Sequence, residues 1–160
     1  MTAVMNDYLS RISTILDYLV IKGYIQDLKV ACSGFSMGAY VTYLLPLYDK
    51  RFKTIVAISG SPYYYDKNAV KRFNISNTNS PDLARIQATD EIEAFRDLNI
   101  LLIHNKDDET VSYLGSGRFY NKLKPLINKG KISLILNEKG GHRYYSYMDE
   151  EIISWLDKCL

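Results

Sequence analysis

One stretch decides how this chain folds: Leu28-Lys29-Val30-Ala31-Cys32-Ser33-Gly34-Phe35-Ser36-Met37-Gly38. Its first part, residues 28–33, is a short and mainly apolar run that predicts a buried strand. A Gly-x-Ser-x-Gly pentapeptide follows at once, and residues 39–48 predict a helix that ends at Pro46 or soon after it. A strand, a tight turn and a helix around Ser36 would present its hydroxyl at the carboxyl end of the strand.

The turn has a physical logic that suits nucleophilic chemistry. Glycines have no Cβ, so Gly34 and Gly38 would let the strand and the helix approach each other around a strained serine. The backbone N–H of Met37 would then face a developing oxyanion, at the start of a helix whose dipole favours negative charge. The plainer alternative is a glycine-rich turn with a capping serine.

The pattern outside this turn alternates helices with strands. Short apolar runs predict further strands at residues 52–58, 100–103 and 132–136. Helical spacing and local composition predict helices at residues 8–20, 81–88, 91–95, 117–128 and 149–160. Short apolar strands separated by helices are typical of a parallel sheet that is covered on both faces. We therefore expect one α/β domain over residues 1–160, a three-layer sandwich with a mostly parallel sheet of about four strands.

Composition excludes several classes of protein. The 160 residues carry a net charge of +2, and the basic residues are scattered, so we expect no nucleic-acid partner. No apolar run approaches the length of a membrane span and the N-terminus does not read as a signal peptide, so we expect a cytoplasmic protein without a membrane partner. Cys32 and Cys159 are interpreted as reduced thiols. The spacing of histidines and cysteines gives no metal motif, and no phosphate-binding loop occurs, so we expect neither metal nor cofactor.

A serine hydroxyl becomes a nucleophile when a base takes its proton, and the base needs an acid to orient it. The chain has two histidines, His104 and His142. His142 lies in a loop just after the fourth predicted strand, where ligand chemistry takes place in such sheets, and it is favoured as the base. His104 closes the third strand and is interpreted as a support for the next loop through hydrogen bonds.

Two carboxylates follow the third strand at the same edge, Asp107 and Asp108. We interpret one as a turn residue and the other as the acid, with Asp108 favoured. Tyr63 and Tyr64 follow the second strand and are candidates for lining a substrate pocket. The alternative for these tyrosines is that they cover the rim of the core.

These motifs together resemble the α/β-hydrolase superfamily, and in particular its dienelactone-hydrolase and prolyl-oligopeptidase-like carboxylesterase branch. In that branch the third strand reads like His-Gly-x-x-Asp-x-x-Val, and the stretch from His104 to Val111 departs from this pattern only at Asn105. The resemblance implies Ser36 as nucleophile, Asp108 as acid and His142 as base.

The resemblance runs from about residue 6 to the end of the chain, and it implies that the family's first strands, about four of them, are absent. The nucleophile strand would then be a sheet edge with unpaired backbone groups, where self-association or a partner chain could add a strand. The oxyanion hole would keep Met37 and lose its second donor, which costs about 3 to 4 kcal/mol in a related case. We expect the C-terminal part of the α/β-hydrolase fold.

Three functions follow from this reading. The first is a serine hydrolase that cleaves a small-molecule carboxylic ester through an acyl-enzyme on Ser36. The second is a truncated or split hydrolase with little activity alone. The third is a non-catalytic interaction module that keeps the fold, against which the retention of Ser36, Asp108 and His142 argues. The sequence does not separate esterase from thioesterase or peptidase, and it does not identify the acyl and leaving groups.

Overall fold

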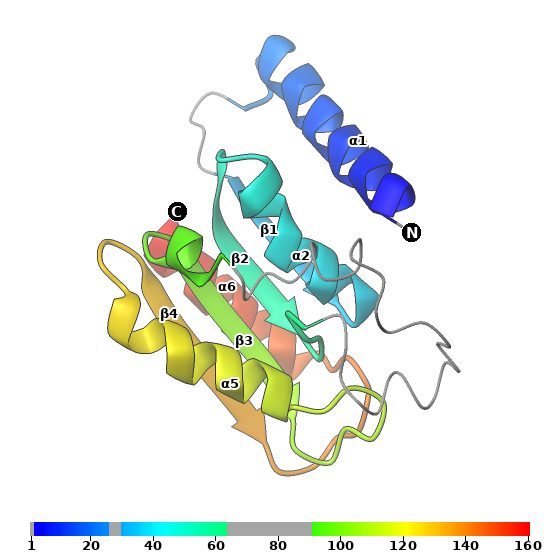
Figure 1. The fold of residues 1–160 in the computed structure, drawn as a ribbon, viewed down its shortest axis with the longest axis vertical. Coiled ribbons are helices and arrows are strands. Elements are labelled where there is room, and N and C mark those ends of the chain that lie inside the picture. The colour runs from blue at the N-terminus through cyan, green and yellow to red at the C-terminus, as the bar shows by residue number, and fades with distance from the viewer. Residues whose placement is uncertain (1, 26–29, 64–90) are drawn as a thin grey trace.

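The computed structural model describes residues 2–25, 30–63 and 91–160. Its strands form a single parallel sheet in the order β1-β2-β3-β4. The strands are β1 (Val30–Phe35), β2 (Phe52–Ile58), β3 (Asn99–Asn105) and β4 (Lys131–Asn137). Each strand pairs with the strands that precede and follow it along the chain. Because all the pairings are parallel, the carboxyl ends of the four strands lie at one edge of the sheet (Figure 1).

Helices lie on both faces of this sheet. The α-helices are α1 (Thr2–Ile21), α2 (Met37–Tyr48), α5 (Leu114–Leu123) and α6 (Tyr147–Cys159), and the short 3-10 helices are η1 (Ile92–Phe95) and η2 (Lys124–Leu126). α2 and α5 cover one face, and α6 covers the opposite face (Figure 1). The expected three-layer α/β sandwich with four parallel strands is confirmed.

The two central strands, β2 and β3, are mainly apolar because both of their faces are buried. On one face, Ile55 and Leu102 pack with Tyr43 of α2 and Phe119 of α5. On the other face, residues such as Ile103 pack with Met148 of α6. Burial of each such side chain stabilises the fold by about 1.5 to 3 kcal/mol. This packing explains why these two strands are largely continuous apolar runs rather than alternating patterns.

The helix α1 packs on the outer side of α2. Leu9 and Leu16 of α1 are buried against a cluster that includes Tyr40 and Leu44 of α2. Near the end of α2, Asp49 accepts hydrogen bonds from Ser13 of α1 and from Arg51. Both apolar packing and a hydrogen bond therefore hold α1 against α2.

α2 continues through Pro46 and ends at Tyr48. Proline has no N–H, so the carbonyl of Thr42, one turn earlier, has no helical donor there. The Cys32 thiol lies 3.9 Å from this carbonyl and is placed to donate to it. β1 and α2 are thus joined by this side-chain contact as well as by the turn at Ser36.

The described elements come in the predicted order, although most of their ends are shifted. The helix predicted at 8–20, for example, is α1 and begins at Thr2. β2 has the predicted bounds, whereas β1 runs two residues further than predicted because Gly34 and Phe35 pair with Ala57 and Ile58. The helix predicted at 117–128 begins earlier, at Leu114, and gives way at Lys124 to the 3-10 turn that contains Pro125. The helix predicted at 91–95 is the 3-10 helix η1, and the one predicted at 81–88 lies outside the described residues.

β1 occupies the edge of the sheet. Among the residues that the structure describes, it pairs with β2 alone, and the side chain of Ser33 in its middle is exposed. The edge position expected for the nucleophile strand is observed in this part of the chain.

Candidate active site

Ser36 lies on the turn between β1 and α2 in a conformation that few residues other than glycine adopt. Its φ is 56° and its ψ is −115°. Its N–H donates to the carbonyl of Ile58 at 2.9 Å, which extends the β1–β2 pairing to the turn. Strain of this kind persists where the surroundings fix the backbone, and it is found at active sites.

Two glycines make this turn possible, and one of them was not predicted. A Cβ on Gly34 would lie 2.2 Å from the carbonyl oxygen of Gly38, so residue 34 must be glycine. A Cβ on Gly60, after β2, would lie 2.9 Å from the carbonyl oxygen of Ser36. The expectation for Gly38 itself is wrong in one respect: a Cβ there would meet no atom within 4 Å, so close packing does not require that glycine.

Ser36, His142 and Asp108 form one hydrogen-bonded line. His142 Nε2 is 2.8 Å from Ser36 Oγ, and His142 Nδ1 is 2.8 Å from Asp108 Oδ2. A carboxylate only accepts hydrogen bonds, so Nδ1 carries the proton that it shares with Asp108. Nε2 of the neutral ring is then the acceptor for the Ser36 hydroxyl, which is the tautomer that a general base requires.

Both carboxylate oxygens of Asp108 accept hydrogen bonds. Its side chain is fully buried, and Oδ1 accepts the N–H groups of Thr110 and Val111 at 2.9 and 2.8 Å. Oδ2 accepts from His142 and also lies 3.3 Å from Nε2 of His104. The loop after β3 thus wraps around this carboxylate and fixes its direction.

Asp107 faces a different partner. It is exposed, and it accepts the N–H groups of Gly140 and Gly141 at 3.1 and 2.7 Å. The hydrogen bond from Gly141 and then that from Gly140 lower the pKa of this carboxyl. The two neighbouring aspartates are therefore divided as the sequence suggested, with Asp108 beside His142 and Asp107 in the turn.

His104 lies behind the line rather than in it. It is fully buried, with Nδ1 3.0 Å from Ser116 Oγ and Nε2 3.0 Å from the carbonyl of Val111. Burial lowers the pKa of this imidazole, although its contacts with Val111 and Asp108 oppose the shift. These contacts match the interpretation of His104 as a support for the loop that carries Asp108.

Met37 is the first residue of α2, so its N–H has no helical acceptor before it. It adjoins Ser36 at the positive end of the helix dipole, where an oxyanion would be stabilised. Its side chain is 63% exposed. The backbone group that we predicted as an oxyanion donor is thus at the helix start.

The tyrosines that we predicted to bind substrate are only partly described. The ring of Tyr63 lies near Gly115 at the start of α5, and burial raises the pKa of its hydroxyl. Tyr64 lies outside the described residues. A substrate-binding role for either tyrosine stays a prediction.

The structure adds residues that the sequence reading did not single out for a role at the site. The ring of Phe35, the second residue of the pentapeptide, lies against the His142 ring with centroids 4.9 Å apart. The ring of Tyr144 meets Phe35 edge-on at 6.2 Å. Asn105 contacts the loop of His142 through its side chain. In the sequence, the departure from the family pattern at Asn105 was the one feature that could have pointed to this contact of Asn105.

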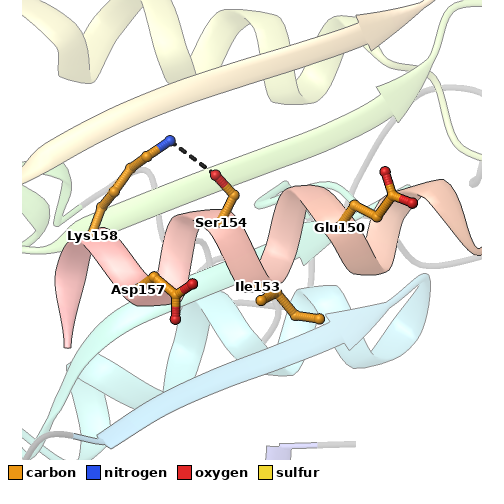
Figure 2. Close-up of a pocket in the computed structure, with 5 residues that line it drawn as sticks. All are labelled: Glu150, Ile153, Ser154, Asp157 and Lys158. Atoms are coloured by element: carbon orange, nitrogen blue, oxygen red, sulfur yellow. Dashed lines mark hydrogen bonds between the residues drawn. The ribbon is translucent and has the colours of Figure 1, made fainter.

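Three further observations concern metal ligands, membrane-spanning helices and a surface hollow among the described residues. It contains no cluster of three or more histidine, cysteine or carboxylate side chains that could bind a metal ion. None of its helices combines the length and the apolar character needed to cross a bilayer. A hollow in the surface is lined by Glu150, Ile153, Ser154, Asp157 and Lys158 (Figure 2). All five belong to α6, and none contacts Ser36 or His142 through a hydrogen bond.

Solved structures of serine peptidases and esterases have the same fold. Acylaminoacyl peptidase from Pyrococcus horikoshii superposes with a TM-score of 0.77 at 17% identity, over 91% of this chain and 26% of that one. Dipeptidyl peptidase 4 from Porphyromonas gingivalis gives 0.68 at 18% identity, over 86% of this chain and 20% of that one. Esterase PE8 gives 0.65 at 20% identity, over 99% of this chain and 63% of that one. The chain thus spans about a quarter of the acylaminoacyl peptidase.

Sequence comparison gives a family, although no curated protein sequence matches this chain. The model of the prolyl oligopeptidase family matches residues 6–160, which is nearly the whole chain. The superfamily and the branch that the motifs resembled are thereby confirmed. The strained serine turn, the parallel sheet and this match lead to one conclusion: the chain belongs to the prolyl oligopeptidase family, within the α/β-hydrolase superfamily.

Proposed function

We propose that this chain is a serine hydrolase that cleaves small carboxylic esters through an acyl-enzyme on Ser36. The observation that carries the proposal is the unbroken line of hydrogen bonds from Asp108 through His142 to Ser36, with both links at 2.8 Å. This geometry lets one ring accept the serine proton while the buried carboxylate stabilises the imidazolium that forms.

The reaction takes place in two halves. As Ser36 Oγ attacks the ester carbonyl carbon, its proton passes to His142 Nε2 and the carbonyl oxygen becomes an oxyanion beside the Met37 N–H. The intermediate collapses, the bond to the alkoxy oxygen breaks, and His142 returns the proton to the leaving alcohol. Water then gives a proton to His142 and attacks the acyl carbon. The bond between the acyl carbon and Ser36 Oγ breaks, His142 returns the proton to Oγ, and the carboxylic acid leaves.

The test is labelling of Ser36. We expect a fluorophosphonate probe to label the wild-type chain and p-nitrophenyl acetate to give a burst of p-nitrophenol. Ser36→Ala should lose both, because such a serine contributes up to about 10⁶-fold in a related hydrolase. A wild-type chain that is folded by circular dichroism and stays unlabelled would overturn the proposal.

A peptidase is the second candidate, and the family match favours it. Two of the similar structures are named as peptidases, acylaminoacyl peptidase and dipeptidyl peptidase 4. An acylated amino-acid p-nitroanilide and the corresponding p-nitrophenyl ester separate the two activities. Cleavage of the anilide that is lost in Ser36→Ala would favour the peptidase, whereas cleavage of the ester alone would favour the esterase.

The edge of β1 leads to a proposal about partners. Within the described residues, the outer side of β1 has no neighbouring strand and Ser33 is exposed. We propose that a second polypeptide strand, from another copy or another chain, pairs there and that labelling and hydrolysis at Ser36 are faster when it does. Size-exclusion chromatography with labelling of each fraction tests this, and a monomer with full activity would count against it.

A further inference from the structure

The loop before His142 is fixed by side chains from elsewhere in the fold. Asp107 accepts the N–H groups of both Gly140 and Gly141. The carbonyl of Gly140 accepts the Tyr145 hydroxyl at 2.9 Å, and the carbonyl of Gly141 accepts Nδ2 of Asn105 at 2.8 Å. All four backbone polar groups of this dipeptide are therefore bonded to side chains.

The dipeptide needs such bonds because it has little stiffness of its own. Gly140 has a φ of 149° and Gly141 has a φ of 61°, and glycine has the largest conformational freedom to lose on folding. A Cβ on Gly140 would come within 2.7 to 3.1 Å of the atoms of the Asn105 amide. The amide is thus packed directly against the backbone that leads into His142.

Asn105 is itself held in one orientation. It is fully buried at the end of β3, where it pairs with Asn137 of β4. Its Oδ1 accepts from Asn137 Nδ2 at 3.2 Å and from the Tyr147 hydroxyl at 3.3 Å. The carbonyl of Gly141 can only accept, so the atom that faces it must be Nδ2, and Oδ1 then faces Asn137 and Tyr147.

Burial separates the contribution of Asn105 from that of Asp107. Asp107 is exposed, and water can replace its bonds to the loop. Asn105 is buried, so removal of its amide takes away a donor in a place that water does not readily fill. Of these two side chains, Asn105 is therefore the one on which the backbone before His142 depends more.

We propose that Asn105 is a positioning residue that sets the orientation of His142 through the Gly140-Gly141 backbone. The proposal deepens the serine hydrolase function and rests on it. It assigns a role to the one position at which the stretch from His104 to Val111 departs from the family pattern. The N–H of its amide, rather than the volume of its side chain, positions the backbone before His142.

The experiment compares Asn105→Asp and Asn105→Ala with Asn99→Asp and Asn99→Ala. Asn105→Asp keeps the shape and the acceptor and loses the donor, and Asn99 lies at the opposite end of the same strand. We expect the rate of fluorophosphonate labelling to fall about 10- to 100-fold in both Asn105 variants, since small misplacement of a catalytic group has effects of this size. Both Asn99 variants should keep the wild-type rate.

A second readout does not need activity. The Nδ1 proton that His142 shares with Asp108 should give a low-field proton NMR resonance, which His142→Gln identifies by removing it. We expect this resonance in the wild type and the Asn99 variants, and its loss or broadening in the Asn105 variants at temperatures where circular dichroism shows them folded.

The outcomes separate this inference from the function on which it rests. If the wild type is not labelled, the hydrolase proposal fails, and the resonance still decides whether Asn105 orients His142. If Asn105→Ala does not fold, Asn105→Asp provides the comparison. A folded Asn105→Asp with an unchanged resonance and a wild-type labelling rate would overturn the inference.

Discussion

The two halves of the candidate active site are built in different ways. The nucleophile half, residues 30–40, holds Ser36 by backbone sterics at the edge of the sheet, with Gly34 packed against the carbonyl of Gly38. The base half, residues 104–111 and 137–147, holds Asp108 and His142 by hydrogen bonds among buried and half-buried groups. Substitutions should therefore damage the first half by clashes and the second by loss of polar partners.

The largest effect is expected in the base half. Asp108→Asn should lower the acylation rate by about 10⁴-fold, because an amide can stabilise the wrong tautomer of the histidine and cannot stabilise the imidazolium. Asp107→Asn is the matched control, since Asp107 bonds to the loop and not to His142. Stopped-flow measurement of the p-nitrophenyl acetate burst gives both rates, and equal losses in the two variants would refute the division between the aspartates.

The next prediction tests whether the side of β1 that packs against the core, where Cys32 lies, is inaccessible to reagents. Burial raises the pKa of the Cys32 thiol to about 12, well above its ordinary value, and the thiolate is the form that reacts. Iodoacetamide at pH 8 should therefore modify Cys32 about 10²- to 10³-fold more slowly in the native chain than in urea. Peptide mass spectrometry follows the reaction, and similar rates in both conditions would mean that β1 opens readily.

The clash in the nucleophile half can be tested with its two glycines. Gly34→Ala should lower the free energy of unfolding by about 2 to 3 kcal/mol, because the added Cβ meets backbone atoms that cannot move aside. Gly38→Ala should change it by less than about 1 kcal/mol and in the stabilising direction, since the site is open and alanine favours a helix. Urea denaturation measures both, and a larger loss for Gly38→Ala would contradict the steric account.

The smallest effect concerns the attachment of α1 to the nucleophile half. Hydrogen bonds from Arg51 lower the pKa of Asp49 to about 2, and the side chain of Asp49 is 10% exposed. A folded-state pKa below the unfolded value means that this stabilisation is present above about pH 4 and is lost as the pH falls towards 2. Asp49→Asn should lower the free energy of unfolding by about 1 to 2 kcal/mol at pH 6, with a gap that narrows towards pH 2. If the unfolding free energies of the wild type and Asp49→Asn differed equally at pH 6 and pH 2.5, the ionised form of Asp49 would not be the source of the stabilisation.

The elements that the sequence predicted well are those whose pattern is local. The apolar run at 52–58 gave β2 with its bounds, because a strand buried on both faces needs mainly apolar side chains. The end of β1 was placed too early, because Gly34 and Phe35 are strand residues only through their pairing with Ala57 and Ile58. Local composition does not record that pairing.

The same distinction holds for the site. Asp108 was favoured over Asp107 as the acid, and the family pattern pointed to the same residue. In the structure the N–H groups of Thr110 and Val111 hold the Asp108 carboxylate beside His142. Gly60 could not be recognised beforehand, because the atoms that require it, those of Ser36 and Ala39, lie more than twenty residues away along the chain.

The sequence by itself determined which residues are the candidate nucleophile, acid and base, namely Ser36, Asp108 and His142, and the α/β class of the fold. A motif and an alternation of strands with helices can be recognised from local residue types. Only the tertiary structure decided how these residues meet. The ends of β1, β3 and β4 are far apart in the chain, and the parallel register brings them to one edge. The fixing of His142 by Asn105 arises from that register, in which Asn105 and Asn137 stand side by side beneath the glycine loop.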